Sequence, residues 1–73
     1  MYAPQEYPLV VYWSAEDGCF VVEVPDLPGC LADGATQAEA IGNAQVVITE
    51  WLETALELQR PIPAPRPRLR IAS

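Results

Sequence analysis

The sequence predicts a small α+β domain in which an antiparallel sheet of three to four strands packs against one long helix, in the order β-β-β-α-β. Three observations lead to this prediction: short β-branched and aromatic runs in the first half of the chain, a long run with helical apolar spacing in the second half, and a proline- and glycine-rich segment between them. We expect a single domain over residues 1–73, with its core between about residues 7 and 71.

The first two strands are expected to form a hairpin. Residues 7–14 have the sequence Tyr-Pro-Leu-Val-Val-Tyr-Trp-Ser, and residues 19–24 resume the same strand-like composition. Between them, Asp17-Gly18 is a strong signal for a hairpin turn. The two strands should therefore pair antiparallel.

One face of the second strand is expected to be the core face. Side chains alternate along a strand, so Phe20, Val22 and Val24 share one side. Because Glu23 interrupts the opposite side, we expect the Phe20 side to be buried.

The segment of residues 25–30, Pro-Asp-Leu-Pro-Gly-Cys, is expected to reverse the chain. Pro28 and Gly29 occupy the second and third positions of a type II turn, which requires a positive φ at the glycine. Residues 30–33 then form a short third strand that ends at Gly34.

A long helix is predicted over residues 37–59. Thr36 is its expected N-cap, with Glu39 as the capping-box partner three residues later. Apolar residues recur at spacings of three and four and should form a stripe that lies on the sheet. This predicted stripe contains Ile41, Ala44, Ile48, Trp51, Ala55 and Leu58, and is widened by Leu52 and Leu56.

The segment after the helix cannot be helical, because four of residues 60–67 are prolines. We expect an extended, polyproline-like return of the chain. In residues 68–71, apolar and arginine side chains alternate, which is typical of an edge strand. This would be the fourth strand of the sheet.

Composition argues against catalysis and cofactors. The chain has no histidine, and the spacing of Cys19 and Cys30 matches no zinc site, so we expect two small buried thiols, no metal, no cofactor and no catalytic residue. A two-metal nuclease would need converging carboxylates, and Glu23, Asp26 and Asp33 are near one another in sequence. Aspartates in turns usually accept local backbone hydrogen bonds, so this alternative is weak.

Charge is distributed unevenly along the chain. All ten acidic residues precede residue 60, and the four basic residues are arginines at positions 60, 66, 68 and 70. An acidic body attracts basic proteins and repels nucleic acid, so a basic, RNA-binding protein is the better partner candidate and we expect no direct binding to nucleic acid. In the simpler alternative, the acidic surface only aids solubility and the tail folds back onto it.

Length and hydropathy bear on location and assembly. A domain this small buries only about 60% of its unfolded surface, so self-association into a dimer or tetramer is expected. The sequence shows no signal-peptide pattern and no apolar stretch of about 18 residues, so we expect a cytoplasmic protein without membrane contact.

Four motifs together resemble the HicB-like antitoxin domain over residues 7–71: Asp17-Gly18, residues 24–30, the Gly-x-Thr-x-x-Glu-Ala helix entry at residues 34–40, and the Ile-Pro-x-Pro segment at residues 62–65. The resemblance implies a partial RNase H-like fold, homo-oligomerisation, and binding to a small HicA-type toxin that cleaves mRNA and whose catalytic histidine the antitoxin masks. The motif residues themselves are expected to be structural: Pro25, Leu27, Pro28, Gly29, Gly34, Thr36 and Glu39.

Two functions follow as hypotheses. In the first, the protein is an antitoxin that occludes a basic ribonuclease through acidic contacts on the hairpin and its adjoining loop, namely Glu16, Asp17, Glu23, Asp26 and Asp33. In the second, it is a stand-alone homo-oligomeric module with a scaffold or other protein-binding role and no toxin partner. We expect no C-terminal DNA-binding domain, so operator binding would need another protein.

Overall fold

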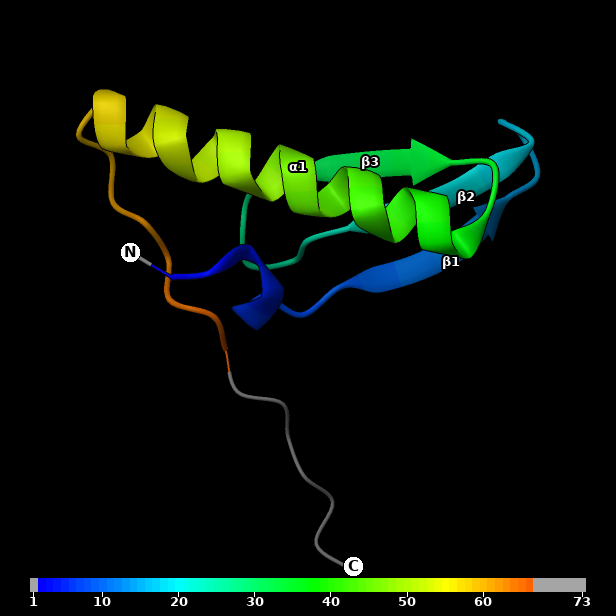
Figure 1. The fold of residues 1–73 in the computed structure, drawn as a ribbon, viewed down its shortest axis with the longest axis horizontal. Helices are drawn as coiled ribbons and strands as arrows, with labels where there is room; N and C mark the ends of the chain where they lie inside the picture. Colours follow the sequence, from blue (N-terminus) through cyan, green and yellow to red (C-terminus); the bar gives the residue numbers. More distant parts are fainter. Residues whose placement is uncertain (1, 67–73) are drawn as a thin grey trace, which may run out of the picture.

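The computed structural model describes residues 2–66 and shows a three-stranded antiparallel sheet, in the order β1-β2-β3, with one helix on one of its faces (Figure 1). The predicted α+β class is confirmed. The predicted fourth strand at residues 68–71 lies outside the described residues. The elements are a 3-10 turn η1 (Pro4–Glu6), strands β1 (Val10–Ser14), β2 (Cys19–Glu23) and β3 (Leu31–Gly34), and helix α1 (Gln37–Glu57).

Strands β1 and β2 form the predicted hairpin, in a register that pairs Trp13 with Phe20. Gly18 has a φ of 64°, and its N–H donates to the Ser14 carbonyl at 2.9 Å. The first strand begins at Val10, three residues later than predicted. Tyr7 instead ends the η1 turn, where its ring is buried with 3% exposure.

The Phe20 side of the sheet is the core face, as predicted. Val22, in the middle of β2, is fully buried and pairs with Val11 on one side and Ala32 on the other. With Ala40 and Ala44 of α1, Val22 forms one of two core clusters. We call this group of three buried residues the sheet cluster.

The second core cluster lies beyond the strand ends, under the C-terminal half of α1. It is built by larger side chains, and Leu9, Val47, Trp51 and Ile62 pack against its edge. The loop cluster, as we name it, consists of the buried residues Tyr7, Val24, Leu27, Cys30, Ile48 and Leu52.

The helix lies very close to the sheet at Gly34, the last residue of β3. A Cβ placed there would lie 2.5 Å from the Ala40 backbone nitrogen and 2.9 Å from its Cα. Only glycine permits this approach, because the obstructing atoms belong to the helix backbone. The small side chains of Ala40 and Ala44 complete the close packing, with 0% exposure each.

Helix α1 begins as predicted and ends two residues early. Its N-cap is Thr36, whose Oγ1 accepts the Glu39 N–H at 3.1 Å, while Glu39 Oε1 accepts the Ala35 N–H at 3.4 Å. The helix stops at Glu57, and the chain then turns through Gln59, which has a φ of 55°.

The predicted apolar stripe of α1 is partly wrong. Ile41, Leu56 and Leu58 are exposed, by 37%, 53% and 55% of their surface. The close approach at Gly34 rotates small residues into the interface, so alanines rather than the larger neighbours face the sheet. The residues that are buried are Ala40, Ala44, Ile48, Leu52 and Ala55.

The helix is much longer than the strands beneath it. At about 1.5 Å per residue, its 21 residues span about 31 Å, whereas a five-residue strand spans about 16 Å. Figure 1 shows the C-terminal half of α1 extending beyond the sheet. That half rests on the loop cluster, which is supplied mainly by irregular segments.

The segment of residues 25–30 forms the predicted type II turn. Gly29 has a φ of 75°, and the Cys30 N–H donates to the Leu27 carbonyl at 3.0 Å. The turn is attached to the helix, because Trp51 Nε1 donates to the Pro28 carbonyl at 3.1 Å.

Residues 61–66 return across the end of the molecule, and we refer to them as the return segment. Ile62 packs against the loop cluster, and the Tyr7 hydroxyl donates to the Pro63 carbonyl at 2.7 Å. At its far end, Arg66 Nε donates to Asp26 Oδ1 at 2.6 Å and the Arg66 N–H donates to Asp26 Oδ2 at 2.9 Å. For Arg66, the tail does fold back onto the acidic body.

Candidate functional site

The face of the sheet opposite α1 is not covered by any element that the structure describes. Strand alternation and the pairing register place eight residues on it, in three rows that cross the strands. We call this surface the open face. Its rows are Val10, Glu23 and Leu31; Tyr12, Val21 and Asp33; and Ser14 and Cys19.

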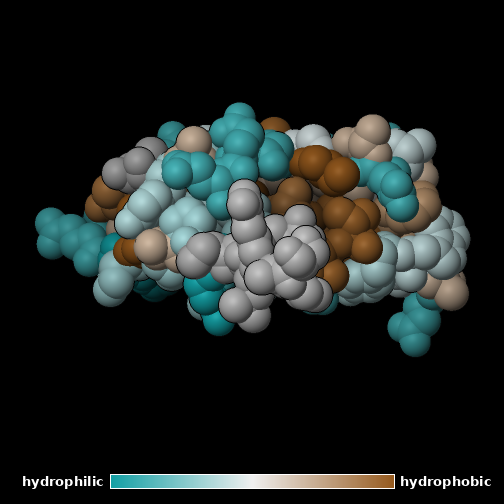
Figure 2. All heavy atoms as spheres, turned by 90° about the horizontal axis from the view of Figure 1, so that it is seen from below, coloured by the Kyte–Doolittle hydropathy of each residue, from teal (hydrophilic) through white to brown (hydrophobic). Residues whose placement is uncertain are grey.

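The open face has an apolar part. Val10, Tyr12 and Leu31 are 47%, 43% and 56% exposed, although they are large and lie within strands. They stand on β1 and β3, the outer strands of the described sheet. Figure 2, which looks at the molecule from the side of η1 and β1, shows apolar side chains gathered among polar ones along this edge and does not show the open face directly. Contiguous exposed apolar side chains are characteristic of interaction surfaces.

The open face is also acidic. Glu23 accepts a hydrogen bond from the Tyr12 hydroxyl at 3.3 Å and borders a shallow depression of about 300 Å³ beside the type II turn. Asp33 and Asp17 border another depression, of about 290 Å³, together with Val21, Leu31 and Ala32. No described lysine or arginine lies on this face, so its charge is available to a basic partner.

Of the five acidic residues predicted to contact a partner, the structure brings three together. Glu23 and Asp33 lie on the open face, and Asp17 lies at its edge, in the β1–β2 turn beside the exposed Glu16. Asp26 does not belong to this group. Its side chain is only 3% exposed, and both of its hydrogen bonds come from Arg66.

The pairing of Asp26 with Arg66 changes the acidity of its carboxyl group. The Arg66 backbone N–H and guanidinium donate to the carboxylate and hold the pKa of Asp26 below its usual range. This aspartate is ionised and engaged within the chain. It anchors the return segment, a role for which its local sequence gave no signal, because Arg66 is forty residues away.

The two thiols lie in different places. Cys30 is buried in the loop cluster, as predicted, and burial raises its thiol pKa. Cys19 is only half-buried, on the open face, where desolvation and the negative charges of Asp33 and Asp17 raise its pKa. Both thiols are free and protonated at neutral pH, so neither is an activated nucleophile.

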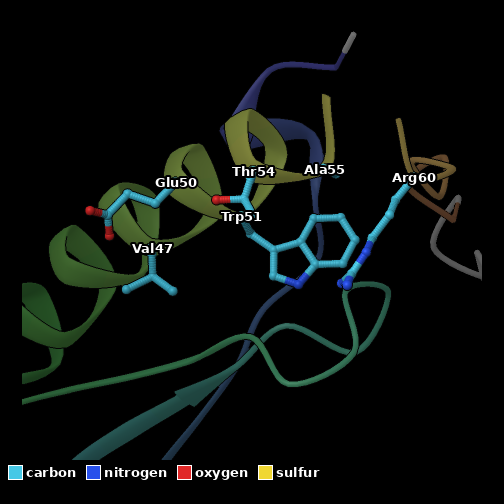
Figure 3. Close-up of a pocket in the computed structure, with 6 residues that line it drawn as sticks. All are labelled: Val47, Glu50, Trp51, Thr54, Ala55 and Arg60. Atoms are coloured by element: carbon cyan, nitrogen blue, oxygen red, sulfur yellow. The ribbon is translucent and has the colours of Figure 1, made fainter. Parts of the chain in front are cut away.

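A second concave region lies at the overhanging end of α1 (Figure 3). It has a volume of about 290 Å³, and Figure 3 shows the Arg60 side chain extending toward the Trp51 indole, which forms its floor. Val47, Glu50, Thr54 and Ala55 line the rest. The region contains neither a paired general acid and base nor a set of metal ligands.

Within residues 2–66, no three His, Cys, Asp or Glu side chains are grouped closely enough to hold a metal ion. Glu23, Asp26 and Asp33 therefore do not converge as a two-metal nuclease requires. The same described part of the chain contains no helix that is long and apolar enough to cross a membrane.

An antiparallel sheet with one helix on a single face defines the structural class, a small α+β domain. Comparison with known proteins identifies the family. The sequence profile of the HicB-like antitoxin of bacterial toxin-antitoxin systems matches residues 7–71, so the chain belongs to the HicB-like antitoxin family. The resemblance inferred from the sequence motifs is confirmed.

Two curated relatives are similar over most of their length. A UPF0150 protein of Synechocystis sp. is 45% identical over 58 residues, which cover 80% of this chain and 78% of the relative. A UPF0150 protein of Thermoplasma acidophilum is 39% identical over 54 residues, or 74% of this chain and 78% of the relative.

A solved structure shares the fold. A chain of a HicA3 and HicB3 toxin-antitoxin complex superposes with a TM-score of 0.71 and is 27% identical in sequence. The match covers 85% of this chain and 70% of that chain.

Proposed function

We propose that this protein is a non-enzymatic, cytoplasmic antitoxin that binds a small basic HicA-type toxin and blocks its mRNA-cleaving site. The observation that carries the proposal is the likeness of the chain to a component of a HicA3 and HicB3 toxin-antitoxin complex. Membership of the HicB-like antitoxin family supports it.

The open face is the proposed contact surface. It combines exposed apolar side chains with carboxylates, which suits a partner that carries apolar contacts and basic residues together. Asp33, Glu23 and Asp17 would attract a ribonuclease whose own surface is basic because it binds RNA. Asp26 would act indirectly, by holding the return segment in place.

The experiment compares two charge reversals. Asp33→Lys places a positive charge on the open face, and the matched control Glu53→Lys places the same charge on the exposed side of α1. Any small basic protein encoded by a neighbouring reading frame is tested as the HicA-type toxin: its binding to this chain is measured by calorimetry, and relief of its growth toxicity is measured by co-expression. We expect Asp33→Lys to weaken binding about tenfold or more and Glu53→Lys to leave it nearly unchanged.

Two results would contradict the proposal. Equal effects of the two substitutions would mean that the open face is not the contact surface. A failure of the wild-type chain to bind the toxin or relieve its toxicity would remove the antitoxin function itself.

Self-association is proposed as a second property, with a stand-alone oligomeric module as the alternative function. The supporting observation is that the outer strands β1 and β3 carry exposed apolar residues at the rim of a small sheet. Sedimentation equilibrium over a range of concentrations tests it. A chain that binds no toxin but forms a stable dimer or tetramer would favour the alternative.

A further inference from the structure

The return segment is held by a site on the folded body of the chain. Tyr7, Asp26 and the loop cluster are buried parts of the folded body, whereas Arg66 keeps 76% of its side chain exposed. One half of the contact is therefore buried, with the return segment in place, and the other half is an exposed side chain. This site, which we call the tail receptor, recognises an apolar side chain, a backbone carbonyl and an arginine.

The contacts of the return segment are made by few groups. Within the described residues, it has no backbone–backbone hydrogen bond, and three of its six residues are prolines, which lack an N–H. It is held by Ile62, by the Pro63 carbonyl and by Arg66. Because it belongs to no sheet or helix, it can leave the receptor as a unit.

The connection between α1 and the return segment is strained. The helix ends in a Schellman motif, in which the Arg60 N–H donates to the Ala55 carbonyl at 2.8 Å and the Gln59 N–H donates to the Leu56 carbonyl at 3.1 Å. The left-handed position of this motif favours glycine, but here it is occupied by Gln59, with a φ of 55°. Extending Gln59 relieves this strain and redirects the return segment.

A short connection under strain invites exchange of a segment between identical chains, and the strained Gln59 stands two residues before Pro61. The hinge follows the end of α1 that extends beyond the sheet (Figure 1). A second copy offers the same tail receptor, so every contact of the return segment is regained after exchange. The alternative, an open tail, leaves the buried Asp26 carboxylate without its two donors.

We propose that two copies of this chain exchange their return segments, with Gln59 as the hinge, so that Asp26 and Tyr7 of each copy bind Arg66 and Pro63 of the other. This inference specifies how copies associate and rests on the proposed self-association, but not on toxin binding. The proposal gives the Pro-Asp-Leu-Pro-Gly segment of residues 25–29 a recognition role, because its Asp26 is the charged group of the tail receptor.

The test uses two substitutions of the hinge in the full chain. Gln59→Gly removes the strain from the closed monomer and therefore removes part of the driving force for exchange. The association constant of the dimer should fall at least about tenfold, because two hinges relax in each wild-type dimer. Gln59→Val raises the strain of the closed monomer, because a β-branched residue disfavours the left-handed region. It should therefore increase the association constant of the dimer. Both constants are measured by sedimentation equilibrium against the wild-type chain.

A second measurement locates the contact. Chains labelled with carbon-13 are mixed with unlabelled chains, unfolded and refolded together, and isotope-filtered NMR detects contacts between the Tyr7 ring of one chain and Pro63 of another. Such contacts in the dimer would support exchange. A dimer whose Tyr7–Pro63 contacts all lie within one chain would overturn exchange but leave self-association intact. A chain that stays monomeric up to about 1 mM would overturn both, because this is a typical effective concentration for a short tether.

Discussion

The close approach of α1 to the sheet predicts opposite effects for the same substitution at two glycines. Gly34 is buried at the end of β3, where an added Cβ would lie 2.5 Å from the Ala40 backbone nitrogen. Gly42 lies on the exposed side of α1, where an added Cβ would meet nothing within 4 Å. Neither glycine has a positive φ, so backbone conformation does not separate them. The difference between the two variants therefore reports the helix–sheet distance.

The magnitude follows from the geometry. An ordinary carbon contact begins at about 3.5 Å, so Gly34→Ala must move the helix or the strand by about 1 Å against backbone atoms. Overpacking of this kind costs about 1–3 kcal/mol, of which the lower entropy of the unfolded alanine chain offsets about 0.4–1 kcal/mol. Gly42→Ala should instead stabilise by about 1 kcal/mol, through helix propensity.

Thermal and urea unfolding, followed by circular dichroism, measure both effects. In a domain of this size, 1 kcal/mol corresponds to about 4–8 °C in Tm, so Gly34→Ala should unfold at a lower temperature and Gly42→Ala at a higher one. The reasoning is refuted if Gly34→Ala is as stable as the wild-type chain. It is also refuted if both variants lose similar stability, since the effect would then come from alanine itself.

Three further predictions concern the core, the helix cap and the return segment. Ile48→Ala removes a fully buried side chain and should cost about 2–5 kcal/mol in urea unfolding, whereas the graded control Ile48→Val should cost only about 0.5–1.5 kcal/mol; equal losses would contradict the packing. Thr36→Ala should cost about 1 kcal/mol and Thr36→Ser much less, because serine keeps the hydroxyl that accepts the Glu39 N–H. The lowered pKa of Asp26 means that its pairing stabilises the fold fully above the unfolded pKa of about 3.9 and that this contribution is lost as the pH falls through the lower folded value. The destabilisation by Arg66→Ala should thus be larger at pH 7 than in acid, while Arg60→Ala should show no such trend; equal losses at both pH values would mean that Asp26 is not the partner.

The features that the sequence predicted well are local. The positive φ of Gly29, the N-cap at Thr36 and the hairpin at Gly18 each depend on residues within four positions of one another. Their steric and hydrogen-bonding requirements are met by the residues present, whatever the rest of the chain does.

The phase of the helix could not be predicted in the same way. Periodicity alone favours large apolar residues, so Ile41 and Leu58 were expected to face the sheet, and both are exposed. The actual phase depends on how closely two backbones approach at Gly34 and Ala40, which is a tertiary property. Small residues are preferred there, and a hydrophobicity pattern gives them little weight.

The candidate site was predicted only where it depends on the local pattern of a strand. Strand alternation, once the Phe20 side was taken as core, was sufficient to place Glu23 on the opposite face, whereas the position of Asp33 depends on the register of β3 against β2. The pairing register places Tyr12 and Leu31 there as well; the tyrosines and tryptophans had been considered for an oligomer interface, but Leu31 was not singled out. The engagement of Asp26 could not be anticipated, because its partner is distant in the sequence.

Because α1 is longer than the strands, the domain has two ends that differ in their free energy of local opening. The first half of the helix rests on the hydrogen-bonded sheet through Ala40 and Ala44, while the second half rests on the loop cluster, which the η1 turn, the type II turn and the return segment help to close. Irregular segments open at lower free energy than paired strands. Amide hydrogen exchange should therefore be faster in the last turns of α1 than in its sheet-bound turns, and the end that carries the tail receptor can open while the open face keeps its shape.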